Sequence, residues 1–240
     1  MNFINPYKKG TLIYNLYALT KNIGLDYLSE THLIDCILST RCYEFIEQYI
    51  DEYLNLYPEK INIFYNGLTP LMIASISTNN YTTEKTVEIL LKHGADPNIQ
   101  NELGYTALME SVILTKTEST ENTIKILIEY GTNLEIQDCQ GMTAIMLSAG
   151  SLSTQSTIQT FLMLLETKQN LNIVDNNNHN VLFILIRSVD KETAEFLVPK
   201  LLELGVNPNV KSKLGWNALD VAKAHSSEKV VKILENKFFT

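Results

Sequence analysis

The stretch Gly67-Leu68-Thr69-Pro70-Leu71-Met72 recurs, with substitutions, at a fixed interval along the chain. Its opening position is met again every 37 residues, at Gly104, Gly141, Asn178 and Gly215. A period between about 20 and 50 residues indicates stacked structural units that share one continuous core. The chain is therefore expected to form one elongated domain. Domains of this kind typically serve as binding surfaces.

A second motif keeps the same interval. It has Asn or Asp at its first position and Asn or Glu at its third. Two motifs in register over several intervals exclude coincidence. The four copies are Asp96-Pro97-Asn98, Asn133-Leu134-Glu135, Asn170-Leu171-Asn172 and Asn207-Pro208-Asn209.

Each unit is expected to contain two helices. Thr69 is a good N-cap residue for the first helix, and Pro70 suits its first turn. The same capping position holds Thr106, Thr143, Asn180 and Asn217. Apolar residues at helical spacing predict a second helix with one buried face. These second helices are expected at 83–93, 121–130, 156–168, 192–204 and 227–237.

Three second helices are followed by Gly94, Gly131 and Gly205, which are expected to end them in the left-handed conformation. Lys168 stands at the equivalent place in the third unit, where a Cβ disfavours that conformation. We therefore expect a different helix ending there. Pro199 falls inside the fourth second helix and predicts a kinked or split helix.

Composition narrows the possible partners. The chain of 240 residues is 45% hydrophobic and has a net charge of −8, as a folded acidic protein does. This acidity argues against a nucleic-acid partner, because a phosphate-binding face needs clustered Lys and Arg. No apolar run reaches the ~18 residues of a membrane helix, and no signal peptide is recognised. Three cysteines without framework spacing favour a reducing compartment, and the predicted location is the cytoplasm.

The repeated motif resembles the ankyrin repeat. Thr69-Pro70-Leu71-Met72-Ile73-Ala74 matches the start of the family's unit, and Gly94-Ala95-Asp96-Pro97-Asn98 matches its end. The histidine usual after the leucine is replaced by Met72, Met109, Met146 and Phe183, and by Asp220 in the last unit. The resemblance covers residues 67–240, and it implies an all-α solenoid of helix pairs joined by β-hairpin-like fingers.

The repeat boundaries follow from this match. Residues 33–37 take the place of 70–74 in a degenerate first unit. Each full unit has four residues more than the family's usual unit, and we place them between the two helices. The expected units are an N-terminal cap with the degenerate repeat at 1–66, repeats at 67–103, 104–140, 141–177 and 178–214, and a C-terminal capping half-repeat at 215–240. The helical pattern between Leu12 and Leu19 is expected to cover the N-terminal end.

The lengthened Ser/Thr-rich loop, as in Thr117-Glu118-Ser119-Thr120, resembles ankyrin arrays encoded by giant DNA viruses of amoebae. The frequent use of asparagine and isoleucine points to an AT-rich genome and agrees with that origin.

The resemblance implies that a protein partner binds to the fingers and to the inner, concave face of the first helices. A row of large side chains follows the opening glycine of each unit, and Trp and Tyr in such a row carry much binding energy. This row consists of Leu68, Tyr105, Met142, His179 and Trp216. The other expected contact residues are Gln100, Glu102, Leu103, Gln137, Gln140, Asn176, Asn177, Lys211 and Lys213.

A structural alternative stands beside this interpretation. The rings of Tyr105 and Trp216 can instead pack on the preceding finger as part of the framework. Polar finger residues such as Gln137 and Asn176 can simply belong to solvated loops.

No catalytic, cofactor or metal site is predicted. The sequence has no phosphate-binding glycine loop and no nucleophile motif. His32 and Cys36 share a helix face, but a zinc site requires more ligands. A monomeric, non-catalytic scaffold is therefore expected, with a viral effector that binds a host protein as the first hypothesis. The alternatives are an adaptor for ubiquitin ligase machinery, and a substrate of an asparaginyl hydroxylase that modifies Asn98 or Asn209.

Overall fold

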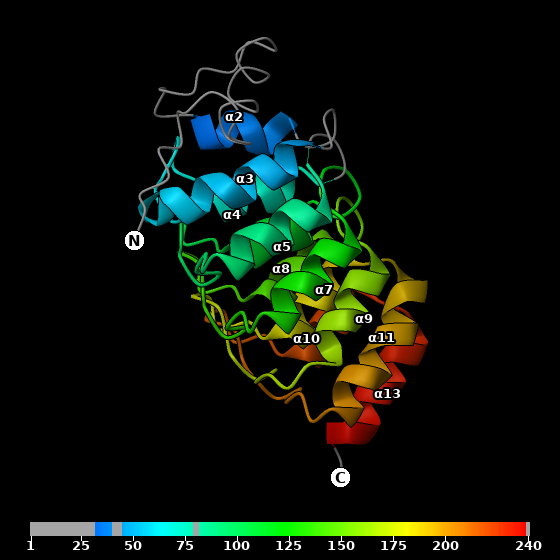
Figure 1. Ribbon diagram of the computed structural model, residues 1–240. Helices are drawn as coiled ribbons and strands as arrows, with labels where there is room; N and C mark the ends of the chain where they lie inside the picture. Colours follow the sequence, from blue (N-terminus) through cyan, green and yellow to red (C-terminus); the bar gives the residue numbers. More distant parts are fainter. Residues whose placement is uncertain (1–31, 40–44, 79–81, 239–240) are drawn as a thin grey trace, which may run out of the picture.

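The computed structural model describes residues 32–39, 45–78 and 82–238 of the chain (Figure 1). Over these residues it is built from helix pairs, and no β-strand occurs among them. The predicted cover at 12–19 lies outside the described residues, as do Cys42 and part of the first inserted loop, at 79–81. The only bridge found in the described part joins Tyr65 and Leu68.

From Pro70 onward, the first helices of the pairs begin at positions 37 residues apart. Four of the five predicted N-caps, Thr69, Thr106, Asn180 and Asn217, accept a backbone N–H of their own first turn, whereas Thr143 makes no such side-chain bond. The predicted starts are therefore confirmed. These helices are α2 (His32–Ser39), α4 (Pro70–Ile76), α6 (Ala107–Ile113), α8 (Ala144–Ser151), α10 (Val181–Ser188) and α12 (Ala218–His225).

The second helices are longer than their partners, except for α9, which equals α8 in length, and they form the other row of the solenoid. They are α3 (Phe45–Leu56), α5 (Glu84–Lys92), α7 (Glu121–Glu129), α9 (Ile158–Leu165), α11 (Lys191–Glu203) and α13 (Glu228–Phe238), with a short 3₁₀ turn η1 (Pro58–Lys60) after α3. Successive first helices pack on one another, and so do most successive second helices. Figure 1 shows the finger loops along one side of these rows.

The core runs without interruption through the stack. The equivalent residues Leu71, Leu108, Ile145 and Leu182 are each at most 1% exposed, so they pack between neighbouring units. Leu219 in the last unit is only partly buried. Such a continuous core is what makes each unit depend on its neighbours.

Helix endings explain the irregular third unit. Gly94, Gly131 and Gly205 have φ between 80° and 86°, as predicted. In those units the next N–H donates to a carbonyl of the last helical turn, for example Ala95 N to Leu90 O at 3.0 Å. At Lys168 the conformation differs, and the side-chain Nε2 of Gln169 donates to Leu164 O at 2.6 Å instead. A side-chain amide thus replaces the backbone donor.

The inserted residues lie between the two helices, as expected. In the second full unit they form the loop 114–120 between α6 and α7. In the fourth unit the loop is short, and α11 begins soon after α10 ends, so the added residues form an extra first turn. The fingers keep one length throughout.

Of the two alternatives expected at Pro199, a kinked or a split helix, the split helix is wrong. Helix α11 runs from Lys191 to Glu203 with Pro199 inside it. Proline lacks the N–H that would bond to Glu195 O. Packing of Leu197, Val198 and Leu201, none of them exposed, holds the helix together across this position.

The second-helix row carries a chain of side-chain contacts that stops part-way. Thr120 Oγ1 donates to Glu84 Oε1 at 2.8 Å, and Thr157 Oγ1 donates to Glu121 Oε1 at 2.6 Å. The next positions in this series hold Ile158 and Ala194, which have no such groups. The series therefore ends between α9 and α11.

Candidate binding surface

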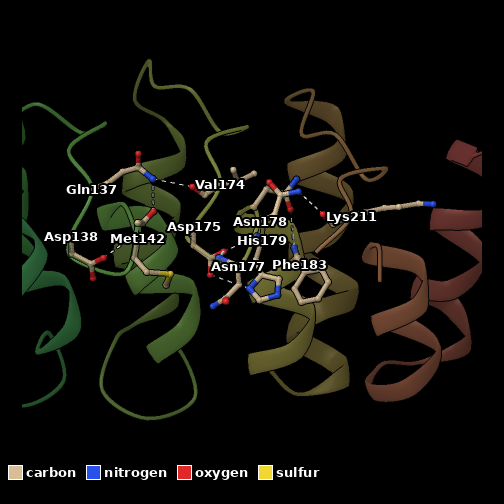
Figure 2. Close-up of polar contacts among 12 residues, drawn as sticks. Gln137, Asp138, Met142, Val174, Asp175, Asn177, Asn178, His179, Phe183 and Lys211 are labelled. Atoms are coloured by element: carbon tan, nitrogen blue, oxygen red, sulfur yellow. Dashed lines mark hydrogen bonds and ion pairs between the residues drawn. The ribbon is translucent and has the colours of Figure 1, made fainter. Parts of the chain in front are cut away.

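Each finger is a tight turn closed by its own backbone and by one polar side chain. Asp138 N donates to Met142 O at 2.9 Å, and Asp138 Oδ1 accepts the N–H groups of Gln140 and Met142, both at 2.8 Å (Figure 2). Asn101 and Asp175 close their turns in the same way. The fingers are thus hairpin-like in their hydrogen bonds without forming a β-ladder.

Successive fingers lie directly against one another. Cys139 N donates to Leu103 O at 3.1 Å, and Asn176 N donates to Gln140 O at 2.9 Å. A Cβ added at Gly104 would lie 2.7 Å from Cys139 N, in a backbone with φ of 79°. At Gly104 glycine is therefore required by both conformation and contact, and a Cβ at Gly141 would likewise lie 2.7 Å from Asn176 N.

Two glutamines that the sequence assigns to the binding face hold the fingers together. Gln137 Nε2 donates to Gly141 O at 2.5 Å in its own finger and to Val174 O at 2.9 Å in the next (Figure 2). Gln100 makes the equivalent pair of bonds one unit earlier, to Gly104 O and Gln137 O. Their amide donors are therefore engaged within the chain.

The fourth unit replaces this arrangement with another residue. Val174 stands at the glutamine position and has no amide. Asn178, at the position of the recurring glycine, has φ of 65° and donates its Nδ2 to Lys211 O. Asparagine tolerates this conformation better than other side chains do. Lys211 O, which is equivalent to the Val174 O that Gln137 bonds, thus still accepts a hydrogen bond from the preceding finger.

The second repeated motif also links neighbouring units. Asn98 Oδ1 accepts from Asn133 N at 2.7 Å, and Asn172 Oδ1 accepts from Asn207 N at 2.7 Å. In the same way, Glu135 Oε1 accepts from Asn170 N at 3.0 Å. The third residue of the motif in one unit therefore fixes the start of the motif in the next.

The row of large side chains after the opening glycine is divided between framework and surface. Leu68, Tyr105 and Met142 are partly buried against the core. His179 stacks on Phe183 with ring centroids 4.2 Å apart, and its Nδ1 lies 3.0 Å from Asp175 Oδ2 (Figure 2).

Trp216 differs from the rest of the row. It is 48% exposed, and the neighbouring Leu214 is 88% exposed. These two side chains line a hollow of about 210 Å³ between the last fingers and the helices α10 and α12. The hollow, named here the terminal groove, is lined by His179, Phe183, Arg187, Ser212, Leu214, Trp216, Val221 and His225.

The remaining predicted contact residues occupy the finger surface. Leu103 is 56% exposed. Asn176 is exposed, yet its Nδ2 donates to Cys139 O at 3.0 Å. The others, Glu102, Gln140, Asn177, Lys211 and Lys213, are exposed as well.

Sequence reasoning did not single out Asp138, Glu110 or Arg187. Asp138 closes a finger, Glu110 lies on the first helix behind Tyr105, and Arg187 lines the terminal groove. Comparison of the equivalent position in each unit gives a signal for Glu110, because Ile73, Leu147 and Ile184 occupy its place elsewhere. A charged residue at a position that is apolar in the other units does not follow the packing pattern of the repeat, and this could have drawn attention to Glu110.

Burial alters two acidic groups in this region. Desolvation raises the pKa of Glu110 above its usual 4.5, and the hydrogen bond from Asn101 Nδ2 offsets only part of the rise. Desolvation also raises the pKa of the Tyr105 phenol, and the nearby charges of Asp138 and Glu110 add to the effect. Tyr105, Glu110 and Asp138 thus form one electrostatic cluster.

Residues 71–167 match the family model for ankyrin repeats, in three copies. The same helix pairs and finger turns continue before residue 71 and after residue 167. The chain has the ankyrin repeat fold. Ankyrin repeat domains are generally scaffolds for protein–protein interaction.

Solved structures share this ankyrin fold. An ankyrin repeat domain from Acinetobacter baumannii superposes with a TM-score of 0.72 at 21% identity, covering 87% of this chain and 98% of that one. The crystal structure of another ankyrin repeat protein gives a TM-score of 0.61 at 20% identity, covering 80% of this chain and 94% of that one.

Two putative ankyrin repeat proteins of Acanthamoeba polyphaga mimivirus are similar in sequence. One is 61% identical over 36 residues, which are 15% of this chain and 7% of that protein. The other is 37% identical over 94 residues, which are 37% of this chain and 14% of that protein. The chain thus spans only a small part of the relatives it matches.

The described part of the ankyrin array holds no group of three or more His, Cys, Asp or Glu side chains placed to bind a metal ion. No helix in that part combines the length and apolar character needed to cross a membrane.

Proposed function

We propose that the ankyrin array binds a protein segment along the surface between its fingers and first helices, anchored in the terminal groove. The observation that carries this proposal is the exposure of Trp216 and Leu214 beside a hollow. The equivalent residues earlier in the row are partly buried, so Trp216 is the member of the row with an exposed side chain. Large aromatic side chains of this kind dominate binding energy.

The charge around the terminal groove supports a partner with acidic groups at this end. Arg187 and His225 line the hollow, and Lys211 and Lys213 are exposed on the adjoining finger. Among the described residues, no ion pair involves Arg187, Lys211 or Lys213. Unpaired cations in a chain of net charge −8 attract a partner's carboxylates and raise the association rate.

The similarity to mimivirus proteins supports a more specific role. In this proposal the array is a viral effector that captures a protein of the amoebal host in its cytoplasm. It acts as a monomer and without catalysis.

The test is affinity capture from Acanthamoeba lysate, followed by calorimetric titration of the identified partner. Trp216→Ala is expected to weaken binding by about 2 kcal/mol, or roughly 30-fold, with little change in thermal stability. Phe196→Ala is the matched control, because Phe196 is 50% exposed on α11 in the other helix row. Equal affinity for both variants, or a large fall in the melting temperature of Trp216→Ala alone, would refute the proposal.

The two alternatives have separate readouts. Recovery of a ligase subunit by the wild-type array favours an adaptor role. Hydroxylation of Asn98 or Asn209 in array recovered from cells favours the hydroxylase substrate. Asn98 Oδ1 already accepts a hydrogen bond from Asn133 N, so a modifying enzyme has to open this junction.

A further inference from the structure

Arg187 is a charged residue at a position that is apolar or small in the other units from residue 67 onward. The equivalent residues are Ile76, Ile113, Gly150 and Ala224. Arg187 lies in the last turn of α10, and its side chain is exposed. The two neighbouring units have Gly150 and Ala224 here, so their side chains at this position are too short to cover the guanidinium. The packing of the repeat therefore does not account for this arginine.

The described residues supply no carboxylate to Arg187. The terminal groove is lined by Arg187 and by no Asp or Glu side chain. Two acidic groups on adjoining elements are already engaged, because Asp175 Oδ2 lies 3.0 Å from His179 Nδ1 and Asp220 Oδ2 accepts from Asn217 N at 3.0 Å. No ion pair among these residues involves Arg187. Its guanidinium thus has no anionic partner in the part of the chain that the structure describes.

Apolar side chains stand beside this cation in the terminal groove. On the finger side Trp216 and Leu214 are largely exposed. On the helix side the hollow is lined by Val221 and by Phe183, on which His179 stacks (Figure 2). A hydrogen bond to an ionised group is stronger beside apolar walls than in open water, because fewer water molecules compete for it. The groove therefore offers adjacent places for an apolar side chain and for an anion.

The donors at this place suit a carboxylate side chain better than other anions. One planar guanidinium presents two parallel N–H donors that match the two oxygens of a carboxylate. Phosphates and chain-terminal carboxylates are commonly held by backbone N–H groups, as at a helix N-terminus. At α12 the first turn is capped by the chain itself, since Asn217 Oδ1 accepts from Asp220 N at 3.0 Å. The ligand that these donors favour is the carboxylate of an Asp or Glu side chain.

We propose that Arg187 binds an Asp or Glu side chain of the partner segment, while a neighbouring apolar side chain of that segment packs against Trp216 and Leu214. The inference rests on the proposed function and names the chemistry that the terminal groove selects. Arg187 makes the direct contact, whereas Lys211 and Lys213 on the finger act only by long-range attraction. Charges at the rim of an interface chiefly alter the association rate, and a hydrogen-bonded pair at the contact chiefly alters the dissociation rate.

The probe is the peptide N-acetyl-leucyl-glutamyl-leucinamide, titrated into the ¹⁵N-labelled full chain. Trp216 is the only tryptophan of the chain, so its indole Nε1–H signal reports on the terminal groove without ambiguity. The Nε–H signal of Arg187, assigned by its loss in Arg187→Gln, reports on the contact itself. Saturable shifts of both signals are expected, and their absence would overturn the assignment.

Three further peptides distinguish the sources of the anion. The neutral isostere N-acetyl-leucyl-glutaminyl-leucinamide is expected to bind about fivefold more weakly, as the loss of one solvent-accessible ion pair predicts. N-acetyl-leucyl-glutaminyl-leucine carries only a terminal carboxylate and is expected to bind as the neutral peptide does. N-acetyl-leucyl-phosphoseryl-leucinamide is expected to bind no more tightly than the glutamyl peptide. Equal binding of the glutamyl and glutaminyl amides, or tighter binding of either other peptide than of the glutamyl probe, would contradict the proposal.

Two variants with the same change of charge complete the experiment. Arg187→Gln is expected to lose the preference for the glutamyl peptide and to bind the glutaminyl amide as the wild type does, which shows that the groove is intact. Lys213→Gln removes an exposed cation from the adjoining finger and is expected to keep the preference. If both variants lose the preference equally, the charge of this end acts at long range and Arg187 makes no specific contact.

The result is separable from the test of the proposed function. Trp216→Ala is expected to weaken both amides alike and to keep the glutamyl preference, followed at the Nε–H of Arg187. If the captured partner depends on Trp216 but the peptides show no glutamyl preference, the assignment of Arg187 alone fails. If the preference is found and Trp216→Ala keeps the partner, the anchoring of that partner fails and the carboxylate contact of Arg187 stands.

Discussion

At the scale of single residues, amide side chains add to the backbone hydrogen bonds between fingers. Gln137 bonds two carbonyls in two different units, and Gln100 does the same one unit earlier. Such a bridge couples neighbouring turns through backbone groups that are otherwise left to water. Its loss therefore affects the stability of the stack directly.

Gln137→Ala is expected to lower the free energy of unfolding by about 1–2 kcal/mol, since two hydrogen bonds of ordinary strength are removed. The measurement is urea unfolding followed by circular dichroism. Gln140→Ala is the control, because Gln140 is an exposed neighbour on the same finger. Identical unfolding curves for the two variants would show that Gln137 lies in a solvated loop and stabilises nothing.

Sequence alone could not assign these glutamines. The acceptor of Gln137 is the carbonyl of residue 174, which any amino acid would supply. A polar residue in a finger therefore looks the same whether it faces a partner or a neighbouring backbone.

We expect Glu110 to give the array a pH-dependent stability. Burial raises its pKa above the usual 4.5, so the folded chain holds the proton more tightly than the unfolded chain does. This favours folding in acid, and the advantage is lost as pH rises from about the unfolded pKa through the folded one. Glu110→Gln is therefore expected to raise stability near neutral pH and to leave it unchanged in acid below both values.

Urea unfolding of Glu110→Gln across this pH range measures the effect. Glu102→Gln serves as the control for a carboxylate in water. A stability difference at Glu110 that stays constant at every pH would contradict the assignment to its ionisation.

At the scale of helices, sequence signals worked where the interaction is local. The N-caps at Thr69, Thr106, Asn180 and Asn217 bond within their own first turn, so spacing and residue type were enough to find them. The sequence predicted that α9 ends differently from the other second helices, but it did not predict which group bonds the last carbonyls of the helix. The use of Gln169 Nε2 depends on a side-chain geometry that spacing does not contain.

Pro199 shows how packing outweighs a local preference. Its substitution in α11 is expected to restore a backbone donor to Glu195 O in a helix that is already continuous. Pro199→Ala should therefore raise the free energy of unfolding, by roughly 1–3 kcal/mol. Ala224→Gly, near the end of α12, is a control for general sensitivity to helix propensity and should lower it.

Urea unfolding decides between the two outcomes for Pro199→Ala. Unchanged or lower stability would mean that α11 is built around the proline and gains nothing from the extra hydrogen bond.

At the scale of the whole molecule, the stack is not uniform along its length. Helices α8 and α10 pack closely in the first row, whereas α9 and α11 approach each other far less in the second. The threonine–glutamate contacts that join earlier second helices are missing at Ile158 and Ala194. A hollow of about 390 Å³ lies at this junction, lined in part by Thr157, Ile158 and Asp190.

Because each unit contacts only its neighbours, a weak junction sets where an array opens. We expect the first turns of α9 and α11 to exchange their amide hydrogens faster than those of α5 and α7, where Glu84 and Thr120 are bonded. The finger side of the same junction should stay protected, since Asn178 bonds Lys211 O there. Hydrogen exchange read by mass spectrometry under native conditions measures both sides, and equal protection along the whole second-helix row would refute an opening between α9 and α11.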